Sequence, residues 1–263
     1  MVCVAAAQQP ASSAPQLSPA EIERFLSTAK MGARRAINVG VAGAEWAPMD
    51  DGKVQHRGHI ATIDVSKPTF TSVRGTELNF KDTWKFNVAA YELAKMVDFP
   101  LIPPSVERRV GGRAAAVTWW IDDAMMEGER MQKKLQSPDL EGWNNQMYAV
   151  RVFNQLIYNV DANLTNLLIT KDWNLWMVDH SRAFRLQKTL ENAKNLVKCD
   201  RKVLANLREL SKPLLTQNLG RWLIGPEIDG ILARRDKIVE FFDKEIAAKG
   251  EAAVLFNLSP RQY

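Results

Sequence analysis

NVDANLTN (residues 159–166) and DHSRAF (residues 179–184) frame the part of the sequence that most sharply predicts the fold. Residues 140–158, which precede the first stretch, carry apolar side chains on one face at helical spacing and predict a long helix. Residues 167–178 lie between the two stretches and read as two short apolar strands joined by a polar turn. The expected order is therefore helix, polar loop, hairpin and second polar loop.

These polar loops contain the residue types that phosphoryl transfer needs. Asp161 is followed five residues later by Asn166, and Asp179 follows the hairpin. A carboxylate near an acceptor hydroxyl can orient it or take its proton, while an amide oxygen and a second carboxylate can bind Mg²⁺ that bridges phosphates. We predict that Asp161 is catalytic and that Asn166 and Asp179 bind metal. Turn-building and capping alone would explain one such loop, but not the combination of helix, spacings and hairpin.

The sequence before residue 122 predicts a smaller lobe of short strands and one buried helix. Turn residues, including Gly111-Gly112, separate the strands, and apolar side chains near every 3.6 residues mark the helix. The expected elements are a helix at 18–29, strands at 36–41 and 59–64, a helix at 82–97 and a hairpin at 103–121.

An α+β fold with two lobes follows from this order of elements. The small antiparallel-sheet lobe is expected at residues 18–122 and a mainly helical lobe with the catalytic loop at 123–250. Residues 251–263 are expected to be a tail, and residues 1–17 a disordered tail or the remnant of a signal peptide. The second reading of the first residues would imply a secreted or periplasmic protein, and the first a cytoplasmic one.

Composition excludes several other classes of protein. The excess of 35 Lys and Arg over 30 Asp and Glu is spread along the chain, so nucleic-acid binding is not expected. Two cysteines provide no disulfide framework, and no apolar run reaches the roughly 18 residues of a membrane span. His56 and His59 would point to opposite faces of a strand, so we interpret them as surface or partly buried strand residues and not as a zinc site.

Residues 159–184 resemble the catalytic and metal-binding segments of the protein-kinase-like superfamily. The pattern D-x-x-x-x-N and the later Asp match, with His180-Ser181 where protein kinases have Phe-Gly. NVAAYEL at residues 87–93, followed by Pro103-Pro104, is similar to the helix and strand of atypical branches. These branches are the secretory-pathway Fam20-like kinases, the HipA-like kinases and the phosphatidylinositol kinases.

This resemblance implies ATP with Mg²⁺ or Mn²⁺ as cofactors, and a protein or small hydroxyl compound as acceptor. Asn87 stands where these kinases have a glutamate, and Glu77 is a substitute acid for the ion pair with a sheet lysine. The expected lysine strand, residues 59–64, contains no lysine. Lys67, with Lys53 and Lys85 as alternatives, is the nearby candidate to hold the phosphates.

Other candidate nucleotide contacts follow from the same resemblance. Gly40 belongs to a short glycine loop that would close over the phosphates, and a plain turn is the alternative. Val117, Trp119 and Trp120 would form the connector on which adenine stacks, and core packing is their alternative role. Arg182 would contact a phosphate or serve as a structural ion-pair partner. The remaining arginines considered, Arg201, Arg234 and Arg235, are interpreted as surface or helix charges.

Three functions are compatible with these residues. The first is ATP- and Mg²⁺-dependent phosphotransfer. The second is a pseudokinase or binding module, because the expected lysine and glutamate are absent. The third is transfer of AMP, which would use the same metal ligands with the nucleotide inverted.

Overall fold

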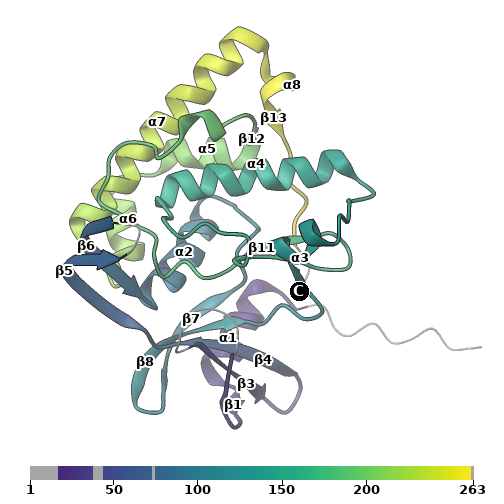
Figure 1. The fold of residues 1–263 in the computed structure, drawn as a ribbon, viewed down its shortest axis with the longest axis vertical. Helices are drawn as coiled ribbons and strands as arrows, with labels where there is room; N and C mark the ends of the chain where they lie inside the picture. The colour runs from purple at the N-terminus through teal and green to yellow at the C-terminus, as the bar shows by residue number, and fades with distance from the viewer. Residues whose placement is uncertain (1–16, 38–43, 73–74, 262–263) are drawn as a thin grey trace, which may run out of the picture.

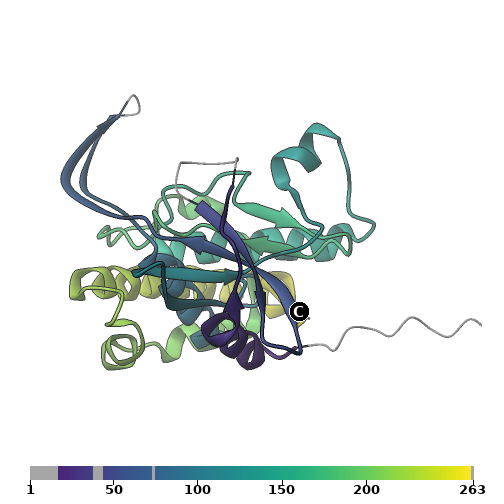
Figure 2. The same ribbon diagram turned by 90° about the horizontal axis from the view of Figure 1, so that it is seen from below.

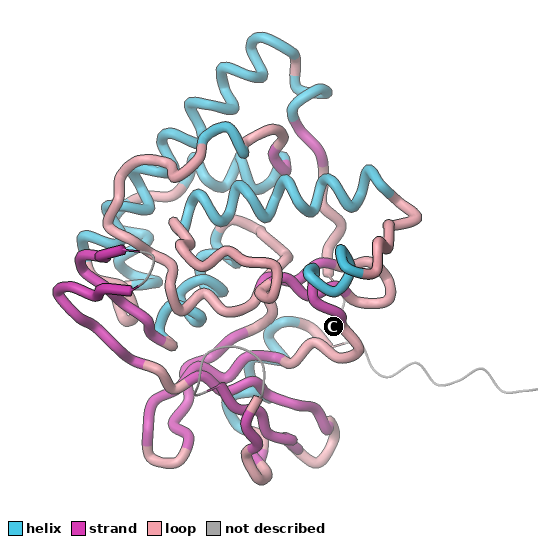
Figure 3. Tube along the Cα trace, in the orientation of Figure 1, coloured by secondary structure: helices cyan, strands magenta, loops and turns pink. Residues whose placement is uncertain are grey.

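Figure 1 shows the computed structural model of the chain, which describes residues 17–37, 44–72 and 75–261. Strands dominate one end of the molecule and helices the other, as Figure 3 shows by colour. The structure thus has the α+β, two-lobed organisation expected from the sequence. The predictions that fall on residues 1–16 and on the Gly40 loop lie outside the described residues.

A six-stranded antiparallel sheet forms the small lobe. Its strands follow the order β1-β3-β4-β8-β7, and β2 also pairs with β3. Their bounds are β1 Lys30–Met31, β2 Arg35–Ala36, β3 Ala44–Asp50, β4 Gln55–Ala61, β7 Ser105–Val110 and β8 Arg113–Trp119. The strand expected at 59–64 ends at Ala61, and the expected hairpin at 103–121 corresponds to β7 and β8.

One face of this sheet packs on the N-terminal helix α1 (Pro19–Thr28). Ile22 and Phe25 of α1 are buried against Ile60 of β4 and Val117 of β8. Ser18 caps the helix by accepting a hydrogen bond from the Glu21 amide while the Glu21 carboxylate accepts from the Ser18 amide, as the start signal predicts. Successive strand residues alternate faces, so the residues between these core positions face away from α1.

Helix α2 (Lys85–Met96) joins the two lobes, because it packs on the sheet and also belongs to the core of the helical lobe. Phe86 and Leu93 of α2 share that core with Phe153 and Leu156 of the long helix α4. Large apolar side chains bury most area there and hold the lobes together.

The helical lobe contains the long helices α4 and α7 with shorter elements around them (Figure 1). The predicted helix at 140–158 and the hairpin after it are both present. The elements are β9 Met125–Met126, α3 Glu127–Gln132, α4 Leu140–Ile157, β10 Leu167–Ile169, β11 Leu175–Met177, η1 Ala193–Asn195, β12 Cys199–Asp200, α5 Arg201–Glu209, α6 Lys212–Leu219, α7 Gly225–Lys249, α8 Glu251–Val254 and β13 Leu255–Phe256.

A long two-stranded antiparallel ribbon is an element that the sequence did not predict. It consists of β5 (Asp64–Ser72) and β6 (Gly75–Thr83), and we call this pair the arm. Figure 2 shows the arm projecting from one corner of the molecule. Its outer residues are exposed, including Leu78 at 70%, so the alternation of apolar and polar side chains that marks a half-buried strand is missing.

The segment predicted as a tail after residue 250 is instead packed on the helical lobe. Strand β13 pairs in parallel with β12, and the Leu258 amide donates to the carboxylate of Asp200. Val254 and Phe256 are buried. The apolar run at residues 252–256 is too short to show a period, and its burial depends on contacts with β12, 56 positions earlier.

Arg234 on α7 is completely buried, contrary to its interpretation as a surface or helix charge. Its guanidinium donates to the main-chain carbonyls of Leu156, Arg185 and Gln187. Burial lowers the pKa of Arg234 to about 10, so the side chain is still charged at neutral pH. One side chain therefore ties the end of α4 and the loop after Asp179 to α7.

We expect Arg234→Ala to lower the free energy of unfolding by at least about 3 kcal/mol, because three carbonyl groups lose a charged donor. Lys237→Ala, an exposed change on the same helix, should alter it by less than about 0.5 kcal/mol. Urea unfolding measures both. Equal stability of the two variants would show that the Arg234 contacts do not hold the lobe together.

Candidate functional site

A cleft of about 310 Å³ lies between the small lobe and the β10–β11 hairpin. Strands β4, β7 and β8, the helix α2 and the connector after β8 contribute its small-lobe wall. Asn166 and Asp179 line the opposite wall with residues of the hairpin. The cleft therefore contains the two predicted metal ligands.

The β10–β11 hairpin brings Asn166 and Asp179 together. Leu167 pairs with Met177, so Asn166 and Val178 are the next positions out along the ladder. The Val178 amide donates to the Asn166 carbonyl at 3.0 Å. The Asn166 side-chain amide donates to the Asp161 carbonyl at 3.0 Å, which leaves its side-chain oxygen as the atom suited to a metal ion.

Asp179 has a left-handed backbone, with φ of 55°, which is uncommon outside glycine. Two hydrogen bonds from the next two residues stabilise this conformation. The Ser181 amide donates to Asp179 Oδ1 at 3.3 Å, and the His180 amide donates to Asn87 Oδ1 at 2.7 Å. The Asp179 residue itself is exposed to the cleft. Asn87 thus fixes the segment that carries the predicted metal ligand.

Asp161 lies in the loop after α4, but it is not among the residues that line the cleft. Its amide donates to Asn159 Oδ1 at 3.1 Å, which orders the loop. The charges of Asp161 and Asp179 both raise the pKa of Asp82, so the three carboxylates occupy one region. The sequence places Asp161 correctly in a loop beside the other two predicted residues.

Asp82, near the end of the arm, is a carboxylate close to Asp161 and Asp179 that the sequence analysis did not single out. Burial is the largest cause that raises the pKa of Asp82, while a hydrogen bond from Ser181 lowers it. Its Oδ1 is buried and has no hydrogen-bond partner among the described residues. Asp82 lies 79 residues before Asp161 in an unpredicted ribbon, so no local pattern marked it.

His59 of β4 is the second missed residue, and it lines the cleft on the strand expected to carry a lysine. Burial lowers the pKa of His59, and the negative charge of Asp179 opposes that effect. In β4, Gly58 and Ile60 on either side of His59 are buried in the sheet core, so that alternation along the strand turns the His59 side chain toward the cleft. His56, in contrast, stacks on Trp119 with ring centroids 3.5 Å apart.

The predicted connector residues divide between the cleft and the core. Trp119 and Trp120 both line the cleft. Trp119, the last residue of β8, is also buried in the small-lobe core, where its ring centroid lies 5.7 Å from that of Phe25. Val117 is completely buried in the small-lobe core with Phe25 of α1. Its neighbour Thr118 faces the cleft instead, because adjacent strand residues point to opposite faces.

Three further predicted contacts lie outside the cleft. Lys67 is exposed on the arm, where its ammonium lies 5.3 Å from the Phe70 ring centre. Glu77, also on the arm, pairs with Arg182 at 2.6 Å and with Arg185 at 2.5 Å. Arg182 therefore has the structural role named as its alternative, and Glu77 joins the arm to the loop after Asp179.

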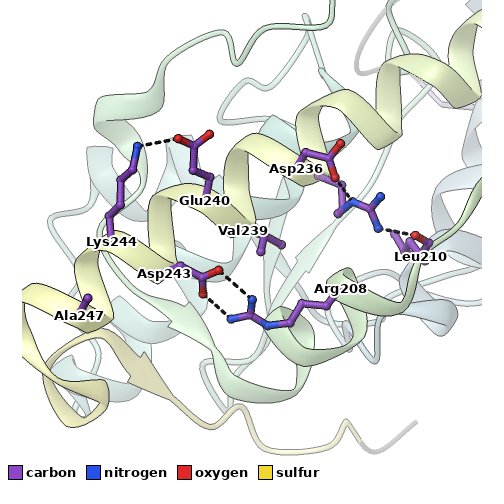
Figure 4. A pocket seen from close by; sticks show the side chains of 9 residues that line it. Arg208, Leu210, Asp236, Val239, Glu240, Asp243, Lys244 and Ala247 are labelled. Atoms are coloured by element: carbon purple, nitrogen blue, oxygen red, sulfur yellow. Dashed lines mark hydrogen bonds and ion pairs between the residues drawn. The ribbon is translucent and has the colours of Figure 1, made fainter.

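A larger hollow of about 680 Å³ lies between α5 and α7, away from this cleft (Figure 4). Arg208 pairs with Asp243 at 2.6 Å, and Lys244 pairs with Glu240 at 2.6 Å. Because these charged side chains already form ion pairs with each other, few of them are available to bind a charged ligand. The cleft with Asn166 and Asp179 is the better candidate site.

The donor set of the cleft suits Mg²⁺ or Mn²⁺ bound together with phosphates. Asn166 and Asp179 supply one amide oxygen and one carboxylate, and Mg²⁺ commonly takes few protein ligands plus phosphate oxygens and water. Within the described residues, no group of three or more His, Cys, Asp or Glu side chains could hold a metal alone. The site therefore fits an ion that arrives with a phosphorylated ligand.

Comparison with solved structures shows that this chain has an atypical protein-kinase-like fold. No family model and no curated protein matches the sequence. The structure of hydra Fam20 with sugar matches with a TM-score of 0.60 and 14% identity, over 91% of this chain and 92% of that one. The Golgi casein kinase matches with a TM-score of 0.63 and 11% identity, over 91% and 78%.

A second structure of the Golgi casein kinase, with Mn/ADP bound, matches with a TM-score of 0.59 and 12% identity. The match covers 92% of this chain and 80% of that chain. The predicted resemblance and the predicted fold class are therefore confirmed at the level of fold. Among the described residues, no helix is long and apolar enough to cross a membrane.

Glu77→Ala should weaken the attachment of the arm, because it leaves Arg185, whose side chain is 6% exposed, without its acidic partner. We expect the free energy of unfolding to fall by roughly 2–4 kcal/mol. This is less than the cost of breaking a fully buried ion pair, since Glu77 is partly exposed. Glu240→Ala, which removes only an exposed pair with Lys244, should cost less than about 1 kcal/mol. Denaturant unfolding measures both variants. A smaller loss of stability in Glu77→Ala than in Glu240→Ala would contradict the role of Glu77 in attaching the arm.

Proposed function

We propose that this protein binds ATP with Mg²⁺ or Mn²⁺ in the cleft and transfers a phosphoryl group to a hydroxyl acceptor. The observation that carries the proposal is the Val178 to Asn166 hydrogen bond, which sets the Asn166 and Asp179 side chains at one wall of the cleft. The kinase-like fold supports it, as does the Mn/ADP bound to one structural neighbour.

Each residue has a separate task in the proposed reaction. Asn166 and Asp179 would hold the metal, which lowers the negative charge of the phosphates when bound. Asp161 would orient the acceptor hydroxyl or take its proton. Trp119 and Trp120 would contact the base, since their position on the connector gives an apolar wall to the cleft. The acceptor is proposed to be a protein or a small hydroxyl compound.

A pseudokinase role is the second candidate, and the small-lobe wall favours it. Asn87 spends its side-chain oxygen on the His180 amide, and no lysine or arginine is among the described residues that line the cleft. Nucleotide binding would then persist without transfer. The two candidates share the metal site and differ only in whether a phosphoryl group leaves the nucleotide.

Asp179→Ala should abolish Mg²⁺-dependent ATP binding, because it removes the carboxylate ligand. We expect little change in Tm, since the Asp179 residue is exposed and its side chain loses only the 3.3 Å hydrogen bond from the Ser181 amide. Isothermal titration calorimetry with Mn²⁺ and ATP measures the binding, and Asp172→Ala, which removes another exposed carboxylate from the β10–β11 turn, is the control. Normal metal-nucleotide binding by Asp179→Ala would refute the site assignment.

Asp161→Asn should preserve ATP binding and reduce phosphoryl transfer by about 100-fold or more, because it removes the group that accepts or orients the proton. Incubation with ATP labelled at the γ-phosphate or the α-phosphate follows the transferred group. Acceptor or self-labelling by the γ-phosphate alone supports phosphotransfer. Labelling by the α-phosphate would indicate AMP transfer, and binding without any labelling by the wild-type protein would favour the pseudokinase.

A further inference from the structure

No lysine or arginine is found among the described residues that line the cleft. The formally charged side chains among its described lining residues are Glu129 and Asp179, both acidic. Lys81 and Lys85, which lie on neighbouring elements, are occupied in ion pairs with Glu227 and Asp64. A polyphosphate would thus meet a wall whose other ionisable side chains are histidines.

His180 is poorly suited to contact a ligand, although it lines the cleft. It is 2% exposed, and burial lowers its pKa to about 4, so the ring is neutral at pH 7. Its Nε2 is enclosed and without a hydrogen-bond partner in the described structure. The His180 amide is also occupied by Asn87. His59 is therefore the other histidine to consider.

A row of polar residues crosses the cleft face of the sheet and ends at His59. His59 pairs with Thr118 on β8, and Thr118 pairs with Ser105 on β7. All three line the cleft. The Ser105 and Thr118 hydroxyls lie 2.8 Å apart and hydrogen-bond to each other. His59 makes no hydrogen bond to another described residue, so its ring N–H can serve a ligand. It is the nitrogen donor of the row, beside the proton of whichever hydroxyl accepts in the Ser105–Thr118 bond.

His59 and the metal ligands line the same cleft from different lobes. His59 belongs to β4 of the small lobe, and Asp179 follows β11 of the hairpin. Burial lowers the pKa of His59 and the negative charge of Asp179 raises it, in keeping with that placement. A phosphate between them would have metal ions on one side and an imidazole N–H on the other. Hydrogen bonds from nitrogen donors to phosphate oxygens are among the stronger polar contacts in proteins.

We propose that His59 binds a phosphate of the nucleotide as the donor of the small-lobe wall. This inference rests on the proposed metal-nucleotide site, and it adds the residue that contacts the phosphates from the sheet. One imidazole replaces a fixed ammonium charge, so the metal ions must supply most of the charge compensation. Nucleotide without metal should consequently bind poorly.

Calorimetry with Mn²⁺-ATP and with adenosine tests this assignment on the full chain. His59→Ala should weaken Mn²⁺-ATP binding by roughly tenfold and leave adenosine binding nearly unchanged, because only the phosphate contact is lost. His59→Lys should bind Mn²⁺-ATP at least as tightly as the wild type. Arg113→Ala, which removes a full charge from an exposed position of the same sheet, is the control and should not distinguish the two ligands.

The outcomes separate this inference from the function on which it rests. Suppose that the wild type and Asp179→Ala behave as proposed. If His59→Ala then binds both Mn²⁺-ATP and adenosine as tightly as the wild type, or binds both more weakly by the same factor, His59 is not a phosphate contact. If Arg113→Ala also weakens Mn²⁺-ATP binding without affecting adenosine binding, the loss reflects the net charge of the protein and the assignment of His59 fails. Failure of the wild type to bind Mn²⁺-ATP would overturn the proposed site and the role of His59 with it. Thermal melting of His59→Lys shows whether this position tolerates replacement.

Discussion

The hydrogen bond from the Val178 amide to the Asn166 carbonyl is the contact on which the candidate site depends. It closes the open end of the β10–β11 hairpin, so that two residues twelve apart in the chain lie side by side. Other main-chain bonds extend this arrangement: the Met177 amide donates to Leu101, and the Phe184 amide donates to Ile157 at the end of α4. Main-chain hydrogen bonds depend little on side-chain identity, so a fold held by them can be shared at the 11–14% identity seen with the structural neighbours.

The small lobe adds a second constraint, because its side chains bind the same loop, in addition to the Thr83 amide, which donates to the Ser181 carbonyl. Asn87 of α2 binds the His180 amide, and Glu77 of the arm pairs with Arg182 and Arg185. Both contacts fall within six residues of Asp179. The arm is thus an attachment between the lobes as well as a projection. Asn87 uses its side-chain oxygen to accept the hydrogen bond from the His180 amide. A glutamate at this position whose carboxylate paired with a lysine would have fewer acceptor sites left for that amide.

The sequence predicted the features that depend on local patterns. The periodic helix before Asn159, the hairpin and the spacing of Asp161, Asn166 and Asp179 are local, and the structure brings the last two into one cleft. The other features depend on distant partners. The arm has few buried side chains, Asp82 gains its significance from carboxylates 79 and 97 residues later, and Val117 and Thr118 differ only in strand phase. A strand shifted by one residue exchanges core and cleft positions, so sequence alone assigned Val117 to the wrong face.

The small-lobe wall of the cleft differs from what the kinase motif implies, because the strand expected to carry a lysine carries His59 instead. A sheet residue that can donate one hydrogen bond, His59, stands opposite an amide and a carboxylate that suit a metal ion. A crystal structure of the protein soaked with Mn²⁺ and ADP tests this account most directly. The account predicts metal bound by Asn166 and Asp179, the phosphates between that metal and His59, and the base against Trp119 and Trp120. Nucleotide bound elsewhere, or in this cleft without contact to Asn166 and Asp179, would contradict it.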